Sequence, residues 1–306
     1  MLVTNKEVLS DASAGGYAVG AFNINNMEIL QAVVETATEE KSPIIVSASP
    51  SAIKYAGLEY LTAMVKAAAK LYPSIPMTMH LDHGKDIETA TMCINGGFTS
   101  VMIDGSRLDF EANIAMTKHV VDLARSKGVS VEAELGKLVS HESTAKDAED
   151  PYTDPDAAVE FVDRTSVDSL AVAIGTSHGA YKFKGDVKLD FEKLKDIRSK
   201  VSVPLVLHGA SGVPSWIVEK ATKYGAELSG AKGIPDEHIK KAISLGIAKI
   251  NIDTDLRLAF TGSVREVMVS SPKVFDPRKI LGPAKENMKK IVQEKMHLFG
   301  SSGKAQ

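Results

Sequence analysis

The 306-residue chain lacks the features that mark secreted, membrane and nucleic-acid-binding proteins. Its single cysteine, Cys93, excludes an intramolecular disulfide. No apolar run is long enough to span a bilayer, and residues 1–10 lack the basic start and apolar stretch of a signal peptide. A net charge of −3 without a basic run argues against nucleic acid as the main partner. These absences predict a soluble, cytoplasmic protein in a reducing compartment.

Short apolar or β-branched runs recur along the chain, each followed by a stretch with helical spacing. Strands are predicted at residues 17–22, 43–47, 77–80, 100–103, 129–133, 169–174, 204–207 and 248–252. Helices are predicted between them at 27–40, 58–71, 87–95, 110–127, 156–165, 191–200 and 236–245, and after the last strand at 257–270. Such alternation predicts α/β architecture: a single (β/α)8 TIM-barrel domain over residues 1–306, a length that barrels of this class routinely reach.

Two segments depart from the simple repeat. The connection at 211–235, after the seventh strand, is long and carries an extra helix at 215–224, while 283–299 adds a C-terminal helix. Because connections longer than about 15 residues tend to be functional or interfacial, the first is expected to shape the site or an oligomer contact. The polar tail 300–306 is expected to be disordered.

Polar residues follow every predicted strand, at the end where barrels of this kind carry their active sites. In chain order they are Asn23 and Asn25, Ser49, Asp82 and His83, Asp104, Glu134, Ser177 and His178, His208 and Ser211, and Asn251, Asp253 and Thr254. Any one of them alone could cap the following helix. Their recurrence on all eight strands favours one shared functional site.

Three of the strand-end residues are histidines, His83, His178 and His208. Zinc accepts neutral imidazole nitrogens in tetrahedral geometry, and a catalytic zinc site keeps one position open. The spacing matches no short zinc motif, so this prediction depends on the barrel bringing distant residues together. Asp104 and Glu134 would be costly to bury without a cation, and they either orient the histidines or bind metal themselves. His80, which precedes the turn, is expected to be a packed core residue.

Glycine-rich turns predict an anion site beside these histidines. They lie at 175–179 and 208–212, and the segment 251–254 follows the eighth strand. Backbone N–H groups in such turns, together with the hydroxyls of Ser211 and Thr254, match the phosphate cradle that barrels often place around strands seven and eight. Lys182 is near enough in sequence to add positive charge.

Eight stretches carry a resemblance to one enzyme family over essentially the full length of the chain. They are YAVGAFNINN at 17–26, HLDHG at 80–84, VMIDGS at 101–106, VEAELG at 131–136, AIGTSHGAY at 173–181, PLVLHGASG at 204–212, KINIDTDLR at 249–257 and FDPR at 275–278. The chain thus resembles the class II fructose-bisphosphate aldolases. The resemblance implies reversible cleavage of fructose 1,6-bisphosphate to dihydroxyacetone phosphate and glyceraldehyde 3-phosphate by a homodimer or homotetramer. It also implies a Zn²⁺ cofactor that Co²⁺ can replace, and it leaves a monovalent cation requirement open.

The resemblance implies a role for each matching residue. His83, His178 and His208 would bind the catalytic zinc, and Asp104 and Glu134 would hold an alternative metal position.

By the same resemblance, Asp82 would exchange a proton with the C4 hydroxyl, and Glu142, after the fifth strand, would handle the proton at C3. The substrate would be bound by Asn25, Ser49, Gly179, Lys182, Gly209, Ser211, Asn251, Asp253, Thr254, Arg257 and Arg278.

The chemistry gives a reason for the metal that is independent of the resemblance. Breaking the C3–C4 bond of a 2-keto sugar leaves negative charge on an enediolate, which a Schiff-base lysine or a metal must stabilise. The sixth strand reads LAVAI at 170–174 and offers no lysine, which favours the metal.

Three other functions are compatible with parts of this pattern. Tagatose-bisphosphate aldolases share the fold, metal and reaction, but they usually carry alanine where this chain has Asp253, so fructose is favoured. A barrel metallohydrolase would not need two phosphate cradles. A non-catalytic binding module would not need Asp82 and three histidines.

Overall fold

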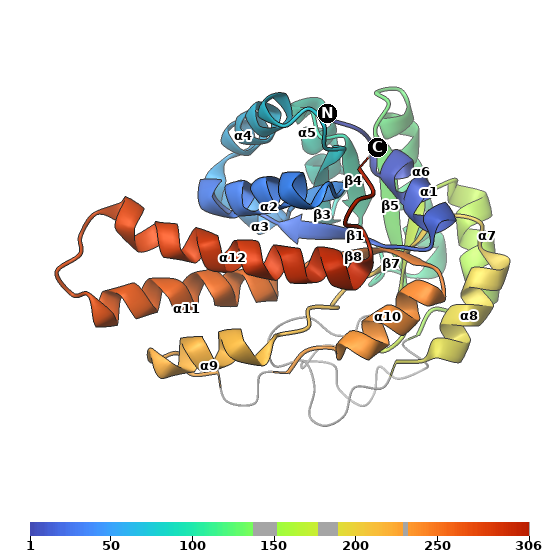
Figure 1. The fold of residues 1–306 in the computed structure, drawn as a ribbon. Coiled ribbons are helices and arrows are strands. Elements are labelled where there is room, and N and C mark those ends of the chain that lie inside the picture. Colours follow the sequence, from blue (N-terminus) through green and yellow to red (C-terminus); the bar gives the residue numbers. More distant parts are fainter. Residues whose placement is uncertain (137–151, 177–188, 229–231, 306) are drawn as a thin grey trace.

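The computed structural model describes residues 1–136, 152–176, 189–228 and 232–305 (Figure 1). Its eight strands are all parallel and pair in sequence order, and β1 also pairs with β8, which closes the barrel. The strands are β1 (Val19–Asn23), β2 (Ile44–Ala48), β3 (Met77–Gly84), β4 (Ser100–Ile103), β5 (Ser130–Leu135), β6 (Ser169–Val172), β7 (Leu205–Leu207) and β8 (Ile247–Ile252). The predicted TIM barrel is confirmed.

Helices surround the strands on the outside of the barrel (Figure 1). They are α1 (Asn5–Gly15), α2 (Met27–Glu40), α3 (Pro50–Ala56), α4 (Leu58–Leu71), α5 (Ile87–Gly96), α6 (Phe110–Arg125), α7 (Pro155–Thr165), α8 (Phe191–Lys200), α9 (Ser215–Lys223), α10 (Asp236–Ser244), α11 (Thr254–Ser270) and α12 (Pro277–Phe299). Four aspartates fix where helices begin: Asp86, Asp109, Asp154 and Asp190 each accept a backbone N–H from the first turn of α5, α6, α7 and α8.

Several boundaries differ from the predicted ones. The short helices α1 and α3 were not predicted, and α12 begins at Pro277 rather than at 283, with Pro283 inside the helix. The prediction of a disordered tail is wrong for residues 300–305. The Ser301 side chain is fully buried and bonds to Ser42, and the N–H groups of Gly303 and Ala305 donate to the carbonyls at the end of α2. These contacts are distant in sequence, so local polarity could not reveal them.

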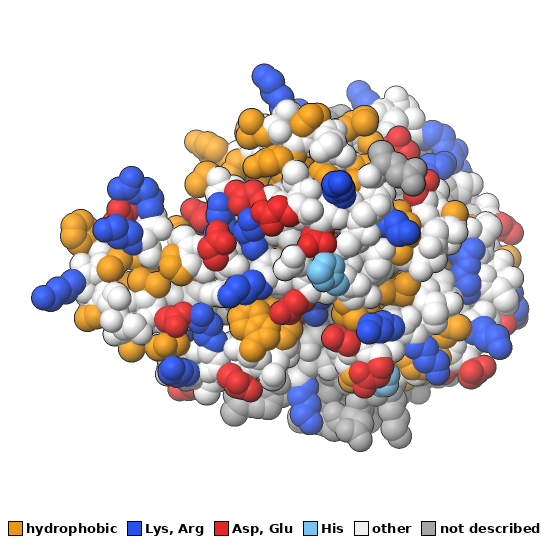
Figure 2. All heavy atoms as spheres, in the orientation of Figure 1, with side chains coloured by type: hydrophobic (Ala, Val, Ile, Leu, Met, Phe, Trp, Pro, Cys, Tyr) orange, Lys and Arg blue, Asp and Glu red, His pale blue; other side chains and the backbone are white. Residues whose placement is uncertain are grey.

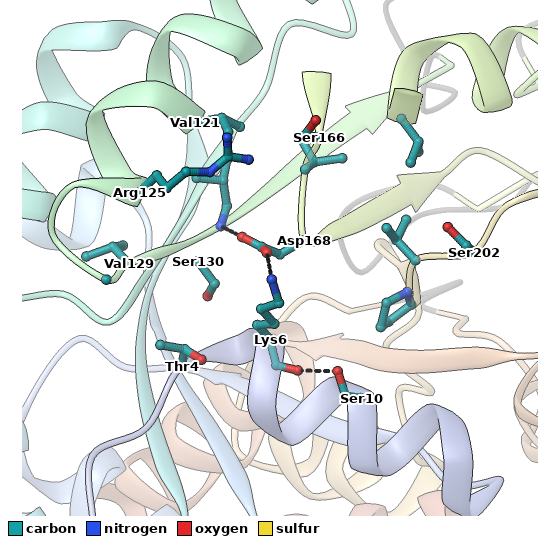
Figure 3. A pocket seen from close by; sticks show the side chains of 16 residues that line it. Thr4, Lys6, Ser10, Val121, Arg125, Val129, Ser130, Ser166, Asp168 and Ser202 are labelled. Carbon is teal, nitrogen blue, oxygen red and sulfur yellow. Dashed lines mark hydrogen bonds and ion pairs between the residues drawn. The ribbon is translucent and has the colours of Figure 1, made fainter. Parts of the chain in front are cut away.

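Helix α1 closes the amino end of the barrel, where it contacts β1, β5 and β8. Figure 3 shows the pocket at this end, with Lys6 reaching 3.1 Å to Asp168, which in turn accepts the backbone N–H of Val131 at 2.9 Å. The floor of the pocket is formed by valines and its rim by exposed polar side chains. It lies at the opposite end of the barrel from the strand-end residues predicted to be functional.

Helices α9, α11 and α12 pack together and extend to one side of the barrel (Figure 1). Where α12 crosses α2, Lys285 and Lys289 pair with Glu35 and Glu39. Figure 2 shows acidic and basic side chains mixed over this face. Among the described residues, no helix is both long and apolar enough to cross a membrane.

Candidate active site

A bulge at the end of β3 turns two neighbouring residues toward the barrel mouth. Leu81 pairs with Val101, but the next pair is Gly84 with Ile103, so β3 holds one more residue than β4 over this interval. His83 adopts a left-handed conformation with φ 52°, which is uncommon outside glycine. Gly84 permits the close approach of the two strands, because a Cβ there would lie 2.6 Å from the carbonyl oxygen of Met102. The bulge therefore brings both Asp82 and His83 to the site.

The Asp82 carboxylate is buried and held by two amides. Asn23 donates to Oδ2 at 2.7 Å, and Asn251 donates to Oδ1 at 2.8 Å. Burial would raise the pKa of Asp82, but the positive charges of His83 and His208 hold it down at about 2. The carboxylate is thus oriented and ionised. Asn251, predicted to contact the substrate, also serves Asp82 directly.

His83 lies against two further carboxylates. Its Nδ1 is 2.9 Å from Asp104 Oδ2 and 3.7 Å from Glu134 Oε2. Burial would lower the pKa of His83, but Asp82 and the hydrogen bond to Asp104 raise it to about 9. Burial, followed by the charge of Asp104, raises the pKa of Glu134 to about 8. The raised pKa values of His83 and Glu134 favour their protonated forms, which offset the negative charge of the neighbouring aspartates. A divalent cation at this place would offset the same negative charge.

His208 follows β7 and is buried beside His83, with 4.5 Å between the ring centroids. Its Nε2 is 2.9 Å from Glu132 Oε1, and its Nδ1 is 3.9 Å from Asp82 Oδ1. The second ring nitrogen of His208 therefore faces the same space as Asp82 and His83.

These donors suit a metal ion. Two overlapping sets each offer ligand atoms within 4.8 Å of one another: Asp82, His83 and His208 in one, and His83, Asp104 and Glu134 in the other. Imidazole nitrogens with carboxylate oxygens fit zinc and other divalent transition metals. His178, the third predicted ligand, lies outside the described residues, as do Glu142, Gly179 and Lys182.

The ends of β1, β2, β3, β7 and β8 surround a pocket at the site. This pocket of about 320 Å³ is lined by Asn23, Ser49, Ser51, Asp82, His83, His208, Gly209, Ser211, Asn251, Asp253, Thr254 and Arg257. It includes seven of the predicted substrate residues. Gly209 has φ 63°, a conformation that favours glycine, so its turn can pass close to a ligand.

The two aspartates of the NIDTD sequence at 251–255 have different roles. Asp253 Oδ1 lies 2.7 Å from Arg257 Nε at the pocket wall. Burial raises the pKa of Asp253 to about 6, partly offset by Arg257. Asp255 is fully buried, accepts the N–H groups of Gly212 and Val213, and pairs with Lys295 of α12. Asp255 thus anchors the loop that follows β7.

Two predicted substrate residues lie away from this pocket. Asn25 lines a neighbouring hollow with Tyr55 and Phe260, while Asn23 takes the place at the metal cluster. Helix α12 begins, at Pro277, at its end far from the barrel (Figure 1). Arg278 is the next residue of this helix, and its side chain is 90% exposed and pairs with Asp276. Within one chain it does not reach the site.

The prediction for His80 agrees with its burial, but the residues around it were missed. His80 is fully buried, with Lys249 Nζ 3.2 Å from its Nε2. The Glu132 carboxylate accepts hydrogen bonds from both Lys249 and His208. A signal was present: Glu132 and Glu134, like Lys249 and Asn251, are two apart in buried strands, and such residues point into the barrel together.

A closed parallel barrel with imidazoles and carboxylates clustered at the carboxyl ends of its strands defines a metal-dependent barrel enzyme. The family model described as fructose-bisphosphate aldolase class-II matches residues 3–227 and 228–304. The chain belongs to this family and is an aldolase, a carbon–carbon lyase.

Similar proteins extend over the whole chain. A fructose-bisphosphate aldolase of Thermus caldophilus is 54% identical over 100% of both chains, and one of Helicobacter pylori strain J99 is 46% identical over 99% of this chain and 100% of the relative. The crystal structure of the YdjI aldolase from Escherichia coli K12 superposes with a TM-score of 0.81 at 38% identity, covering 100% of both chains. Family membership disfavours the hydrolase and binding-module alternatives.

Proposed function

We propose that this chain cleaves fructose 1,6-bisphosphate to dihydroxyacetone phosphate and glyceraldehyde 3-phosphate with zinc as its metal. The observation that carries the proposal is the cluster of Asp82, His83 and His208, whose ligand atoms lie within 4.8 Å of one another at the barrel mouth. The names of the family model and of the relatives support the sugar substrate.

His83 and His208, with His178 from the resemblance, would hold the metal, and Asp104 and Glu134 would offer its alternative position. His83 would ligate through Nε2, because its Nδ1 is bonded to Asp104, and His208 through Nδ1, because its Nε2 is bonded to Glu132. A zinc ion held there supplies the positive charge that stabilises the negative charge developing at C2.

Asp82 is the base that takes the proton from the C4 hydroxyl as the C3–C4 bond breaks. Its carboxylate is ionised, and the amides of Asn23 and Asn251 fix both oxygens, so that little reorganisation is needed for proton transfer. Glu142 is proposed, from the resemblance alone, to return a proton at C3.

The two phosphates of the substrate are assigned to different residues of the pocket. Gly209, Ser211, Asn251 and Thr254 line the pocket and would bind the dihydroxyacetone phosphate end, together with Gly179 and Lys182. Arg257, whose side chain is 54% exposed, lies on the rim and would serve the other phosphate. Ser49 would face the sugar, although its hydroxyl also accepts the Ala52 N–H at the start of α3.

The test is the release of triose phosphate from fructose 1,6-bisphosphate and from tagatose 1,6-bisphosphate, measured separately with a coupled dehydrogenase assay. Asp253 on the pocket wall supports a preference for the fructose sugar. Faster cleavage of tagatose 1,6-bisphosphate would make that C4 epimer the substrate. Release of triose phosphate from neither sugar would refute the proposed function.

We further propose a homo-oligomer, a dimer or a tetramer, with Arg278 reaching the site of a neighbouring chain. Phe275 is 90% exposed and Val269 61% exposed at the far end of the α11–α12 pair, an apolar surface that supports burial against another copy. Sedimentation equilibrium of the wild type would test this, and a monomer would contradict it.

A further inference from the structure

Below the metal cluster, a set of polar side chains is sealed inside the barrel. Glu132, Lys249 and His80 are each fully buried. Lys249 Nζ donates to both oxygens of Glu132, at 2.9 Å and 2.8 Å, and lies 3.2 Å from His80 Nε2. Burying such a pair is costly, and packed apolar residues are often at least as stable. Its presence at this depth therefore needs a reason beyond folding.

The hydrogen bonds in this set have a fixed direction. The lysine ammonium has donors only, so His80 Nε2 must accept, and His80 Nδ1–H then donates to Ser100 Oγ at 2.9 Å. Both oxygens of Glu132 accept hydrogen bonds from Lys249, so Oε1 acts as an acceptor and the His208 Nε2–H donates to it across 2.9 Å. The proton of the His208 ring is thereby placed on Nε2, and Nδ1 carries the lone pair.

We propose that Glu132, held by Lys249, is a positioning residue that fixes the tautomer and ring orientation of His208 for metal binding. The inference deepens the proposed function and rests on its metal site. Lys249 donates to both oxygens of Glu132, so the carboxylate is fixed in place and cannot turn away from His208. The partners of ligating histidines typically strengthen metal affinity by about 10- to 100-fold.

Helix α1 secures the network from the amino end. The side-chain amide of Asn5 lies 3.2 Å from His80 Nδ1, and because Nδ1 carries the proton, the amide must present its oxygen to the ring. The Asn5 backbone N–H donates to Ser130 Oγ at 3.1 Å. The adjacent Lys6 pairs with Asp168 beside Ser130, as Figure 3 shows. A continuous series of contacts thus runs from Asn5 at the closed end of the barrel, through His80, Lys249 and Glu132, to His208.

The test compares two double variants, Glu132→Gln with Lys249→Met and Glu132→Met with Lys249→Met. Both remove the buried ion pair, and glutamine and methionine are similar in size. The two proteins therefore differ mainly in whether residue 132 can accept a hydrogen bond from His208 Nε2–H. Zinc affinity is measured by competition with a chromophoric chelator, and the ligand geometry by the visible absorption of the cobalt-loaded proteins.

We expect the methionine variant to bind zinc about 10- to 100-fold more weakly than the glutamine variant and to show an altered cobalt spectrum. Equal affinities with identical spectra would overturn the proposal. Ser100→Ala is the matched control, since Ser100 contacts His80 and not His208, and its zinc affinity should equal that of the wild type. An equal loss there would also overturn the proposal.

If the methionine variant does not fold, Glu132→Gln alone answers the question. In that variant the amide NH2 takes the place of one carboxylate oxygen. If it takes the place of Oε2 it meets the Lys249 ammonium donor against donor, and if it takes the place of Oε1 it faces the His208 Nε2–H, so in both orientations the contact with His208 is disturbed. Zinc binding should therefore weaken, and adding Lys249→Met should restore it. Wild-type affinity in Glu132→Gln would refute the positioning role. A failure of the proposed function would be seen in the wild type, as absent sugar cleavage, whereas a failure of this inference appears only as a missing difference between variants.

Discussion

Replacing Asp82 with alanine should separate proton transfer from metal binding. Both oxygens of Asp82 already accept hydrogen bonds, from the amides of Asn23 and Asn251, which suits a base beside the metal better than a ligand of it. Loss of a general base typically costs about 10²- to 10⁴-fold in rate, which corresponds to roughly 3–5 kcal/mol of barrier. We expect kcat to fall by that factor.

The folded protein should tolerate this change. The amides of Asn23 and Asn251 lose their acceptor but line the open pocket, so water can replace the carboxylate at a cost of about 1 kcal/mol per bond. The assay is steady-state cleavage with elemental analysis of bound zinc, and His208→Ala is the comparison that should lose both zinc and activity. A zinc-free Asp82→Ala together with a zinc-loaded His208→Ala would show that the two roles are reversed.

Three further changes have expected outcomes. Asp253→Ala should lower kcat/KM for fructose 1,6-bisphosphate about ten- to a hundredfold more than for tagatose 1,6-bisphosphate, from a lost charge-assisted bond, whereas equal losses would mean that Asp253 acts by holding Arg257. Gly84→Ala should lower the free energy of unfolding by about 1–3 kcal/mol, because the new Cβ would lie 2.6 Å from the Met102 carbonyl oxygen. An unchanged melting temperature would contradict the close approach of β3 and β4. Burial raises the pKa of Cys93 to about 12, so a thiol reagent at pH 8 should label it only after unfolding, and rapid labelling of the native protein would count against its burial.

Much of the barrel was predictable because its signals are local. Buried β-branched runs specify strands, and the aspartates that cap α5 to α8 specify where helices begin. The cluster of Asp82, His83 and His208 was predictable because strand order alone brings these residues to one rim.

The remaining features depend on contacts that are distant in sequence. Glu132 and Lys249 are 117 residues apart in the sequence, and their side chains meet only because β5 and β8 both contribute to the inside of the barrel. The choice of Asn23 over Asn25 at the cluster depends on which side chain points inward at the end of β1. The extra residue in β3 could not be inferred from the HLDHG motif without the pairing of β3 with β4.

Metal removal, combined with borohydride trapping, tests whether a metal held by the strand-end histidines drives the cleavage. Dialysis against a chelator should abolish triose phosphate release from fructose 1,6-bisphosphate, and added zinc or cobalt should restore it. Borohydride with dihydroxyacetone phosphate should leave the enzyme active, since a metal mechanism forms no reducible Schiff base. Full activity after complete metal removal, or irreversible inactivation by borohydride with dihydroxyacetone phosphate, would refute the metal mechanism.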